Sequence, residues 1–162
     1  MNKTKNYIII ALYVALASLL SIVETTLLPP LPYGIRIGLA NVITIVALYH
    51  YSIKEALFIN ILRVFLTALL LGGLFNISFF ISLTGALFSS FIYLICDKNT
   101  SSIYFISILS AIFHSIGQLF IVTILYQQIK MLSLLLLLTL MSLLSGTFTA
   151  IIAENILKRV KR

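Results

Sequence analysis

The chain has 162 residues, of which 61% are hydrophobic and 9% are charged, and its formal net charge is +7. A soluble domain of this length cannot bury so much apolar surface, whereas a lipid bilayer solvates it. The composition therefore excludes a soluble domain. Because the basic residues stand at the ends of apolar stretches, they indicate membrane topology and argue against a nucleic-acid partner.

Apolar stretches with short polar connections predict six membrane-spanning helices in the lipid bilayer. The prolines at 29, 30 and 32 predict a rigid, non-helical loop after the first span. The pair Gly72-Gly73 is expected to end the third helix. We therefore expect one all-α integral membrane domain over residues 1–162, a compact bundle of six transmembrane helices. The predicted spans are residues 7–23, 37–51, 56–71, 77–96, 103–126 and 131–153.

Basic residues set the expected orientation. With six crossings, Arg36 and Lys130 fall on the side opposite the termini, and Arg63 lies within a span. The positive-inside rule then predicts a multi-pass cell-membrane protein with both termini cytoplasmic. A re-entrant second span would place the basic C-terminal tail outside, so six crossings are favoured. The basic residues on the side of the termini are Lys3, Lys5, Lys54, Lys98, Lys158, Arg159, Lys161 and Arg162.

Polar residues inside the spans predict a binding site between the midplane and the outer surface. Arg63 lies near the middle of the third span, where a charged side chain costs about 2.5 kcal/mol or more. It is therefore expected to face the bundle interior or an aqueous cavity. We expect a substrate-binding cavity, open to the outside, where the following residues converge: Glu24, Arg36, Asn41, Arg63, His114 and Gln118.

Each of these residues also has a structural explanation. Arg63 would fix helix packing by binding backbone carbonyls or Glu24, and Glu24 would anchor the end of the first span. Asn41, His114 and Gln118 would form ordinary interhelical hydrogen bonds. The sequence leaves both explanations open, because depth in the membrane does not fix the rotation of a helix.

Small residues mark faces of the first and last spans. Ala11, Ala15 and Ser18 share one face, which would either pack internally or dock on a partner membrane subunit. The last span carries a small polar face that is expected to pack internally and to form hydrogen bonds across the bundle. That face consists of Ser142, Ser145, Gly146 and Thr149.

The residues required for autonomous catalysis are missing. There is no glycine-rich phosphate loop, Asp97 is the single aspartate, and Cys96 is the single cysteine. We therefore expect no catalytic residues, no metal site and no resident cofactor. The chain is predicted to bind or conduct a small molecule and to catalyse nothing alone.

Several motifs, spread over nearly the whole chain, resemble one known family. They are Gly38-Leu39-Ala40-Asn41, Ser82-Leu83-Thr84-Gly85 and His114-Ser115-Ile116-Gly117-Gln118, together with Glu24, the three prolines and Arg63. They resemble the Gx transporter family, which is also labelled heptaprenyl diphosphate synthase component I. The synthase label conflicts with the single Asp97, because prenyl chain elongation needs paired aspartates that hold magnesium.

The predicted bundle is also similar to the substrate-binding subunits (S components) of energy-coupling-factor transporters. Those six-helix proteins bind vitamins from outside and dock on a shared transmembrane coupling subunit, which works with ATPases, through an Ala-x-x-x-Ala face. Ala11 and Ala15 match that pattern. The resemblance implies a binding and uptake subunit for a small molecule, an anionic vitamin, cofactor or precursor. The alternatives are a non-transport component of prenyl-lipid or quinone metabolism, and a component of a flavin-based extracellular electron-transfer assembly.

Overall fold

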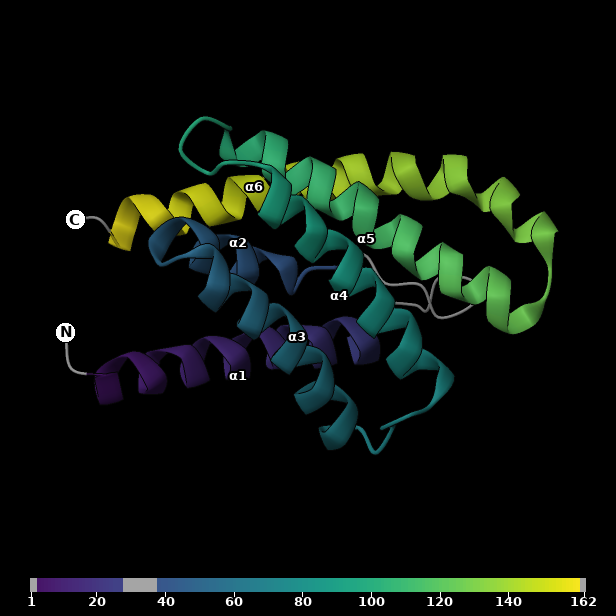
Figure 1. Cartoon of the computed structure of the whole chain (residues 1–162), viewed down its shortest axis with the longest axis horizontal. Coiled ribbons are helices and arrows are strands. Elements are labelled where there is room, and N and C mark those ends of the chain that lie inside the picture. The colour runs from purple at the N-terminus through teal and green to yellow at the C-terminus, as the bar shows by residue number, and fades with distance from the viewer. Residues whose placement is uncertain (1–2, 28–37, 161–162) are drawn as a thin grey trace.

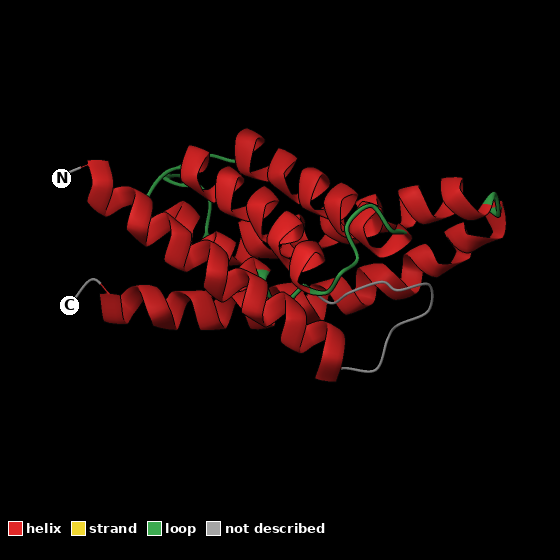
Figure 2. Ribbon diagram, turned by 90° about the horizontal axis from the view of Figure 1, so that it is seen from below, coloured by secondary structure: helices red, strands yellow, loops and turns green. Residues whose placement is uncertain are grey.

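The computed structural model describes residues 3–27 and 38–160, and these residues form an all-helical bundle (Figures 1 and 2). A helix satisfies its own backbone hydrogen bonds, as a chain in lipid requires. The predicted all-α, six-helix fold is confirmed. The helices are α1 (Lys3–Leu27), α2 (Asn41–His50), α3 (Ile53–Leu70), α4 (Ile77–Ile95), α5 (Ile103–Tyr126), the 3-10 helix η2 (Ile129–Leu134) and α6 (Leu135–Val160).

Within residues 3–27 and 38–160, four helical segments are long and apolar enough to cross a membrane: Asn6–Thr26, Ile77–Ile95, Ile103–Tyr126 and Ile129–Val160. Their outward surfaces are apolar, with Leu136 71% and Leu144 68% exposed. Such a surface is stable in lipid and not in water. The protein is therefore a multi-pass membrane protein.

The second helix is shorter than the predicted span over 37–51. It begins at Asn41, because Gly38 adopts a φ of +90° and a turn follows it. The Asn41 amide donates to the Gly38 carbonyl at 2.9 Å, and the Val42 amide donates to the Leu39 carbonyl at 3.1 Å. Asn41 is thus the first residue of the helix, whereas a helix that began at residue 37 would place Asn41 about one turn inside it. With 10 residues, α2 is about 15 Å long, so the helix by itself is too short to span a bilayer core of about 30 Å.

The short helix α2 lies inside the bundle. It packs against α1, α3 and α6, and most of its side chains are buried. The longer helices surround it in pairs: α1 packs on α3, α3 on α4, α4 on α5, and α5 on α6. Helices α1, α2 and α3 therefore all pack against one another.

The predicted small polar face of the last span packs internally, and its four residues are buried. An added Cβ at Gly146 would lie 2.7 Å from the Ile108 Cα, so glycine allows α5 and α6 to approach closely. Ser107 donates a hydrogen bond to the Gly146 carbonyl at 2.7 Å, and the Ser115 and Ser142 hydroxyls lie 2.6 Å apart. These bonds across α5 and α6 confirm the predicted interhelical role.

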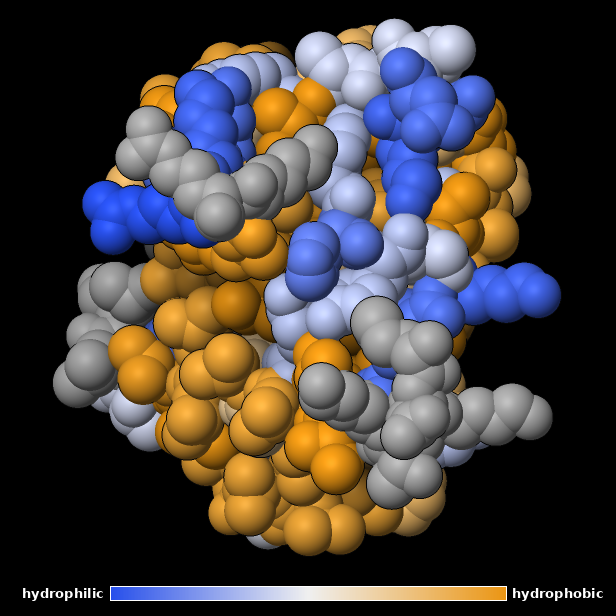
Figure 3. All heavy atoms as spheres, turned by 90° about the vertical axis from the view of Figure 1, so that its left-hand side faces the viewer, coloured by the Kyte–Doolittle hydropathy of each residue, from blue (hydrophilic) through white to orange (hydrophobic). Residues whose placement is uncertain are grey.

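Both described ends of the chain lie at one end of the bundle, together with the α2–α3 and α4–α5 connections (Figure 1). Lys98 ties these two connections, because its Nζ donates to the Leu48 carbonyl at 3.0 Å and the Tyr51 carbonyl at 2.7 Å. Hydrophilic residues gather at this end of the molecule (Figure 3). The α3–α4 turn and the α5–α6 connection lie toward the opposite end.

Candidate functional site

Arg63 joins three helices through its guanidinium group. The side chain is 5% exposed. Its Nε donates to Asn60 Oδ1 at 3.0 Å, its Nη1 to Ser21 Oγ at 3.3 Å, and its Nη2 to Asn41 Oδ1 at 2.8 Å. Because the guanidinium is planar and presents a fixed fork of donors, these bonds set its position and orientation. Arg63 therefore faces the bundle interior.

Asn60 extends this network to α4. Its Nδ2 donates to the Ala86 carbonyl at 3.0 Å and contacts the Ser90 hydroxyl at 2.9 Å and the Ser89 hydroxyl at 3.2 Å. Neither Asn60 nor Ser21 was among the predicted site residues. The position of Asn60 three residues before Arg63, on the same helical stripe, was the available signal for it. Ser21 carried no comparable signal.

Glu24 fastens the end of α1 to the start of α2. Its Oε1 accepts the Gly38 amide at 2.6 Å, and its Oε2 accepts the Leu39 amide at 3.0 Å. The side chain is only 5% exposed. Charge-assisted bonds of this type are roughly twice as strong as neutral ones. The two amides thus stabilise a carboxylate that burial alone would penalise.

His114 and Gln118 form a buried pair on α5. Gln118 Nε2 lies 3.2 Å from His114 Nε2. Gly85 of α4 makes room for both, since an added Cβ there would lie 2.8 Å from His114 Cε1 and 3.0 Å from Gln118 Cγ. The glycine in the α4 motif is therefore explained by the two polar side chains of the α5 motif.

A small cavity brings three of the predicted residues together. Its volume is about 20 Å³, which is room for about one water molecule. We call it the Arg63 cavity. Asn41 and Gln118 do not line it, but Asn41 accepts a hydrogen bond from Arg63 and Gln118 lies 3.2 Å from His114. Arg36 lies outside the described residues. The lining residues are Ser21, Glu24, Gly38, Arg63, Val64, Thr67, Ser82 and His114.

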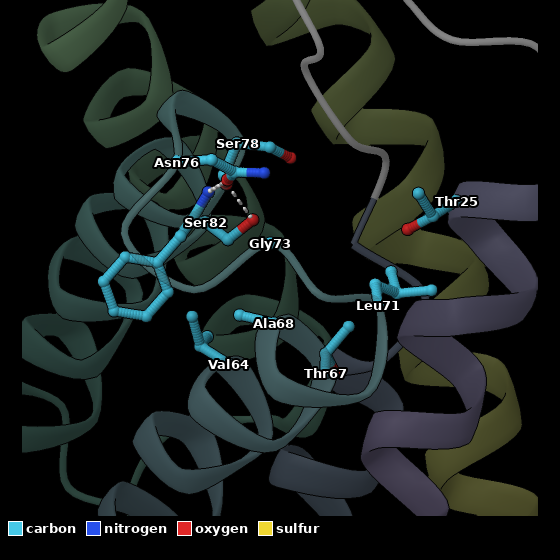
Figure 4. A pocket seen from close by; sticks show the side chains of 10 residues that line it. Thr25, Val64, Thr67, Ala68, Leu71, Gly73, Asn76, Ser78 and Ser82 are labelled. Atoms are coloured by element: carbon cyan, nitrogen blue, oxygen red, sulfur yellow. Dashed lines mark hydrogen bonds between the residues drawn. The ribbon is translucent and has the colours of Figure 1, made fainter.

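A larger pocket lies between α1, α3 and α4 (Figure 4). Its volume is about 180 Å³, and we call it the α3–α4 pocket. It shares Val64, Thr67 and Ser82 with the Arg63 cavity, so these three side chains form the partition between the two spaces. Sequence reasoning missed this pocket. Its lining residues are Thr25, Val64, Thr67, Ala68, Leu71, Gly73, Asn76, Ser78, Phe79 and Ser82.

The structure divides the small-residue face of α1. Ser18 is buried, and its hydroxyl donates to the Val14 carbonyl at 2.8 Å and the Arg63 carbonyl at 3.4 Å. Ala11 and Ala15 are exposed. Ser18 therefore contributes to internal packing against α3, while the two alanines lie on the outer surface of the bundle.

Among residues 3–27 and 38–160, no three His, Cys, Asp or Glu side chains are grouped so that they would hold a metal ion. Comparison with known proteins gives neither a matching curated protein nor a matching solved structure. The family model described as heptaprenyl diphosphate synthase component I matches residues 13–156, from the first helix into the last. The chain therefore belongs to the heptaprenyl diphosphate synthase component I family.

Proposed function

We propose that this membrane protein is a binding and uptake subunit for a small anionic molecule and that it catalyses no reaction alone. The observation that carries the proposal is Arg63, a buried guanidinium in the wall of a cavity that adjoins a larger pocket. A charge inside the membrane costs about 2.5–3.5 kcal/mol on insertion scales, so such a residue usually serves a ligand or an ion pathway.

The network around Arg63 supports an anion site. Amide and hydroxyl oxygens of Asn41, Asn60 and Ser21 hold the guanidinium in place. These three partners are uncharged, and they fix the orientation of the guanidinium. Glu24 lines the same cavity, but its two oxygens are directed to the Gly38 and Leu39 amides. An anionic ligand group would therefore approach Arg63 from the side of the partition.

The two spaces differ in what they admit. The Arg63 cavity, at about 20 Å³, holds no more than about a water-sized group until the partition opens. The α3–α4 pocket has about 180 Å³ and is lined in part by the α3–α4 turn, which lies toward the end of the bundle opposite the termini (Figure 1). We infer that the ligand enters from that end and that its anionic group passes between Val64, Thr67 and Ser82.

Charge supports an outward-facing site. The end shared by the termini holds the start of α3 with Lys54, the α4–α5 connection with Lys98, and the end of α6 with Lys158 and Arg159. The other end holds the α5–α6 connection with Lys130. The positive-inside rule assigns the first end to the cytoplasm. The exposed Ala11 and Ala15 would let a transmembrane coupling subunit with its ATPases approach the α1 backbone closely.

A second candidate is a non-catalytic membrane component of prenyl-lipid metabolism. The family description favours it, and so does the structural role that the Arg63 network can fill. In that case Arg63 would act as a clamp between α1, α2 and α3. It would bind no ligand.

Native mass spectrometry of the purified protein distinguishes the two candidates. The wild type should carry a small anionic molecule. The affinity of Arg63→Met for that molecule should be at least tenfold lower, because a charged hydrogen bond is worth about 1.5–3 kcal/mol. The control Lys130→Met removes an exposed basic charge that lines neither space, and this variant should retain the bound molecule. A folded Arg63→Met protein with undiminished binding would contradict the proposal and favour the clamp, as would a wild type that carries no such molecule.

A further inference from the structure

The α3–α4 pocket has the size of a single ring. Its volume is about 180 Å³, and a cavity of about 150 Å³ in another protein is known to hold benzene. The pocket adjoins the Arg63 cavity, because Thr67 lines both spaces and lies about one helical turn, about 6 Å, from Arg63 along α3. A ligand with one ring and one anionic substituent would therefore span both spaces.

The lining of this pocket is part polar and part apolar, and none of its lining residues is charged. Thr25 Oγ1 donates to the Ser21 carbonyl at 2.7 Å and Ser82 Oγ donates to the Ser78 carbonyl at 2.9 Å, so both oxygens remain available as acceptors. Asn76 Oδ1 accepts the Phe79 amide at 2.8 Å, which leaves the Asn76 NH₂ group as a donor. The walls thus offer donors and acceptors side by side (Figure 4).

Thr67 stands in the partition with its hydrogen-bonding capacity unused. The side chain is 3% exposed, and its hydroxyl has no hydrogen-bond partner within the part of the chain that the structure describes. A buried hydroxyl without a partner costs free energy, and a ligand that supplies the partner recovers that cost. A ligand group that reaches Thr67 would therefore supply the missing partner.

Thr44 provides the matched comparison. Its hydroxyl is also buried and has no partner among the described residues, and it lies on the helix α2. Thr44 lines neither the Arg63 cavity nor the α3–α4 pocket. The two threonines differ in position relative to the pocket, so the same substitution at both separates ligand binding from simple removal of a buried hydroxyl.

We infer that the α3–α4 pocket is the subsite for the uncharged part of the ligand, a planar ring with adjacent N–H and C=O groups. The anionic substituent of that ring extends through the partition to Arg63. This inference rests on the proposed function for its anionic half. The ring subsite itself stands on the volume, the mixed donor and acceptor lining, and Thr67.

The test measures protection of the pocket from chemical modification. In a Cys96→Ser background, the Ala68→Cys variant of the full-length protein places a thiol in the pocket wall, and a small neutral thiol reagent modifies it. Uracil, a ring with adjacent N–H and C=O groups, should slow this modification at least fivefold at millimolar concentration. Benzene, of the same size but without these groups, should leave the rate unchanged. Thermal unfolding of each variant confirms that it is folded.

Added substitutions locate the protection. Thr67→Val should abolish protection by uracil, and Thr44→Val should preserve it. Orotate, which adds a carboxylate to the uracil ring, should protect at a concentration at least tenfold lower than uracil does. Arg63→Met should remove that advantage.

Each outcome decides one of the two proposals. Protection by uracil that needs Thr67 supports the ring subsite. Equal protection by benzene, no protection by uracil, or an Ala68→Cys thiol that does not react at all would overturn it. Orotate that protects no better than uracil, with Arg63→Met without effect, would instead overturn the anion site and leave the ring subsite standing.

Discussion

Arg63 Nη2 donates a hydrogen bond to Asn41 Oδ1 at 2.8 Å, and this bond joins the middle of α3 to the first residue of α2. Both side chains are at least 95% buried, with exposures of 5% and 2%. The bond explains why the two residues matter together although 22 positions separate them. It fixes the short helix at the level of the candidate site.

Replacing Asn41 with alanine should destabilise the protein. The change leaves a buried charged donor without one of its acceptors, at a cost of about 1.5–3 kcal/mol. For a chain of this size each kcal/mol lowers the melting temperature by about 2–4 °C. Thermal unfolding in detergent measures the effect. Asn99→Ala, in the exposed α4–α5 connection, serves as the control and should melt like the wild type.

Glu24→Gln should loosen the turn that precedes α2. Glutamine has a single carbonyl oxygen, so it accepts one of the two amide bonds and presents its NH₂ group to the other. We expect a loss of about 1–3 kcal/mol and faster hydrogen exchange at the Gly38 and Leu39 amides. Mass spectrometry after deuterium labelling reads this exchange directly.

A matched control for that experiment is Glu154→Gln on α6. Glu154 forms an ion pair with Lys158 at 2.9 Å at the surface, and exposed pairs contribute little. Unchanged exchange in the Glu24→Gln protein would show that the carboxylate does not hold this turn.

Gly85→Ala should destabilise the contact between α4 and α5. The added Cβ would lie 2.8 Å from His114 Cε1, and overpacking of this kind costs about 1–3 kcal/mol. The double variant Gly85→Ala with His114→Ala should recover part of the loss, because the smaller side chain removes the closest clash. Additive losses in the double variant would mean that the two residues do not oppose each other.

The expected topology places Lys130 outside and Lys158 inside. In a Cys96→Ser background, cysteine substituted for Lys130 should react with a membrane-impermeant thiol reagent on intact cells. Cysteine substituted for Lys158, an exposed position near the other end of the bundle, should react only after the cells are opened. The reverse pattern would invert the proposed orientation and place the site on the cytoplasmic side.

Ala15→Leu tests docking on a partner subunit. Because Ala15 is exposed, the larger side chain should leave the melting temperature of the isolated protein within a degree or two. It should nevertheless reduce co-purification with a coupling subunit, since a leucine holds two helix backbones apart. Undiminished co-purification would remove this part of α1 from the interface.

Local sequence determined which segments are helical and roughly where they end. The predicted span over 103–126 coincides with α5, and the span over 77–96 with α4 to within one residue. Hydropathy over a stretch of about twenty residues decides whether a helix is stable in lipid, and that quantity needs no knowledge of neighbours. The burial of Arg63 followed from the same reasoning, because lipid excludes its charge from any outward face.

The tertiary structure decided how each helix is rotated about its axis and what its polar residues touch. It turns Ser18 inward and leaves Ala15 outside on the same helix, although both were assigned to one face. It directs the Glu24 carboxylate to the Gly38 and Leu39 amides, and it brings Ser21 and Asn60 to Arg63. Rotation depends on contacts between residues far apart in the chain, where glycines allow close approach and polar groups find partners. For the uncharged polar residues the sequence supplies only depth in the membrane, and depth is the same for every rotation of a helix.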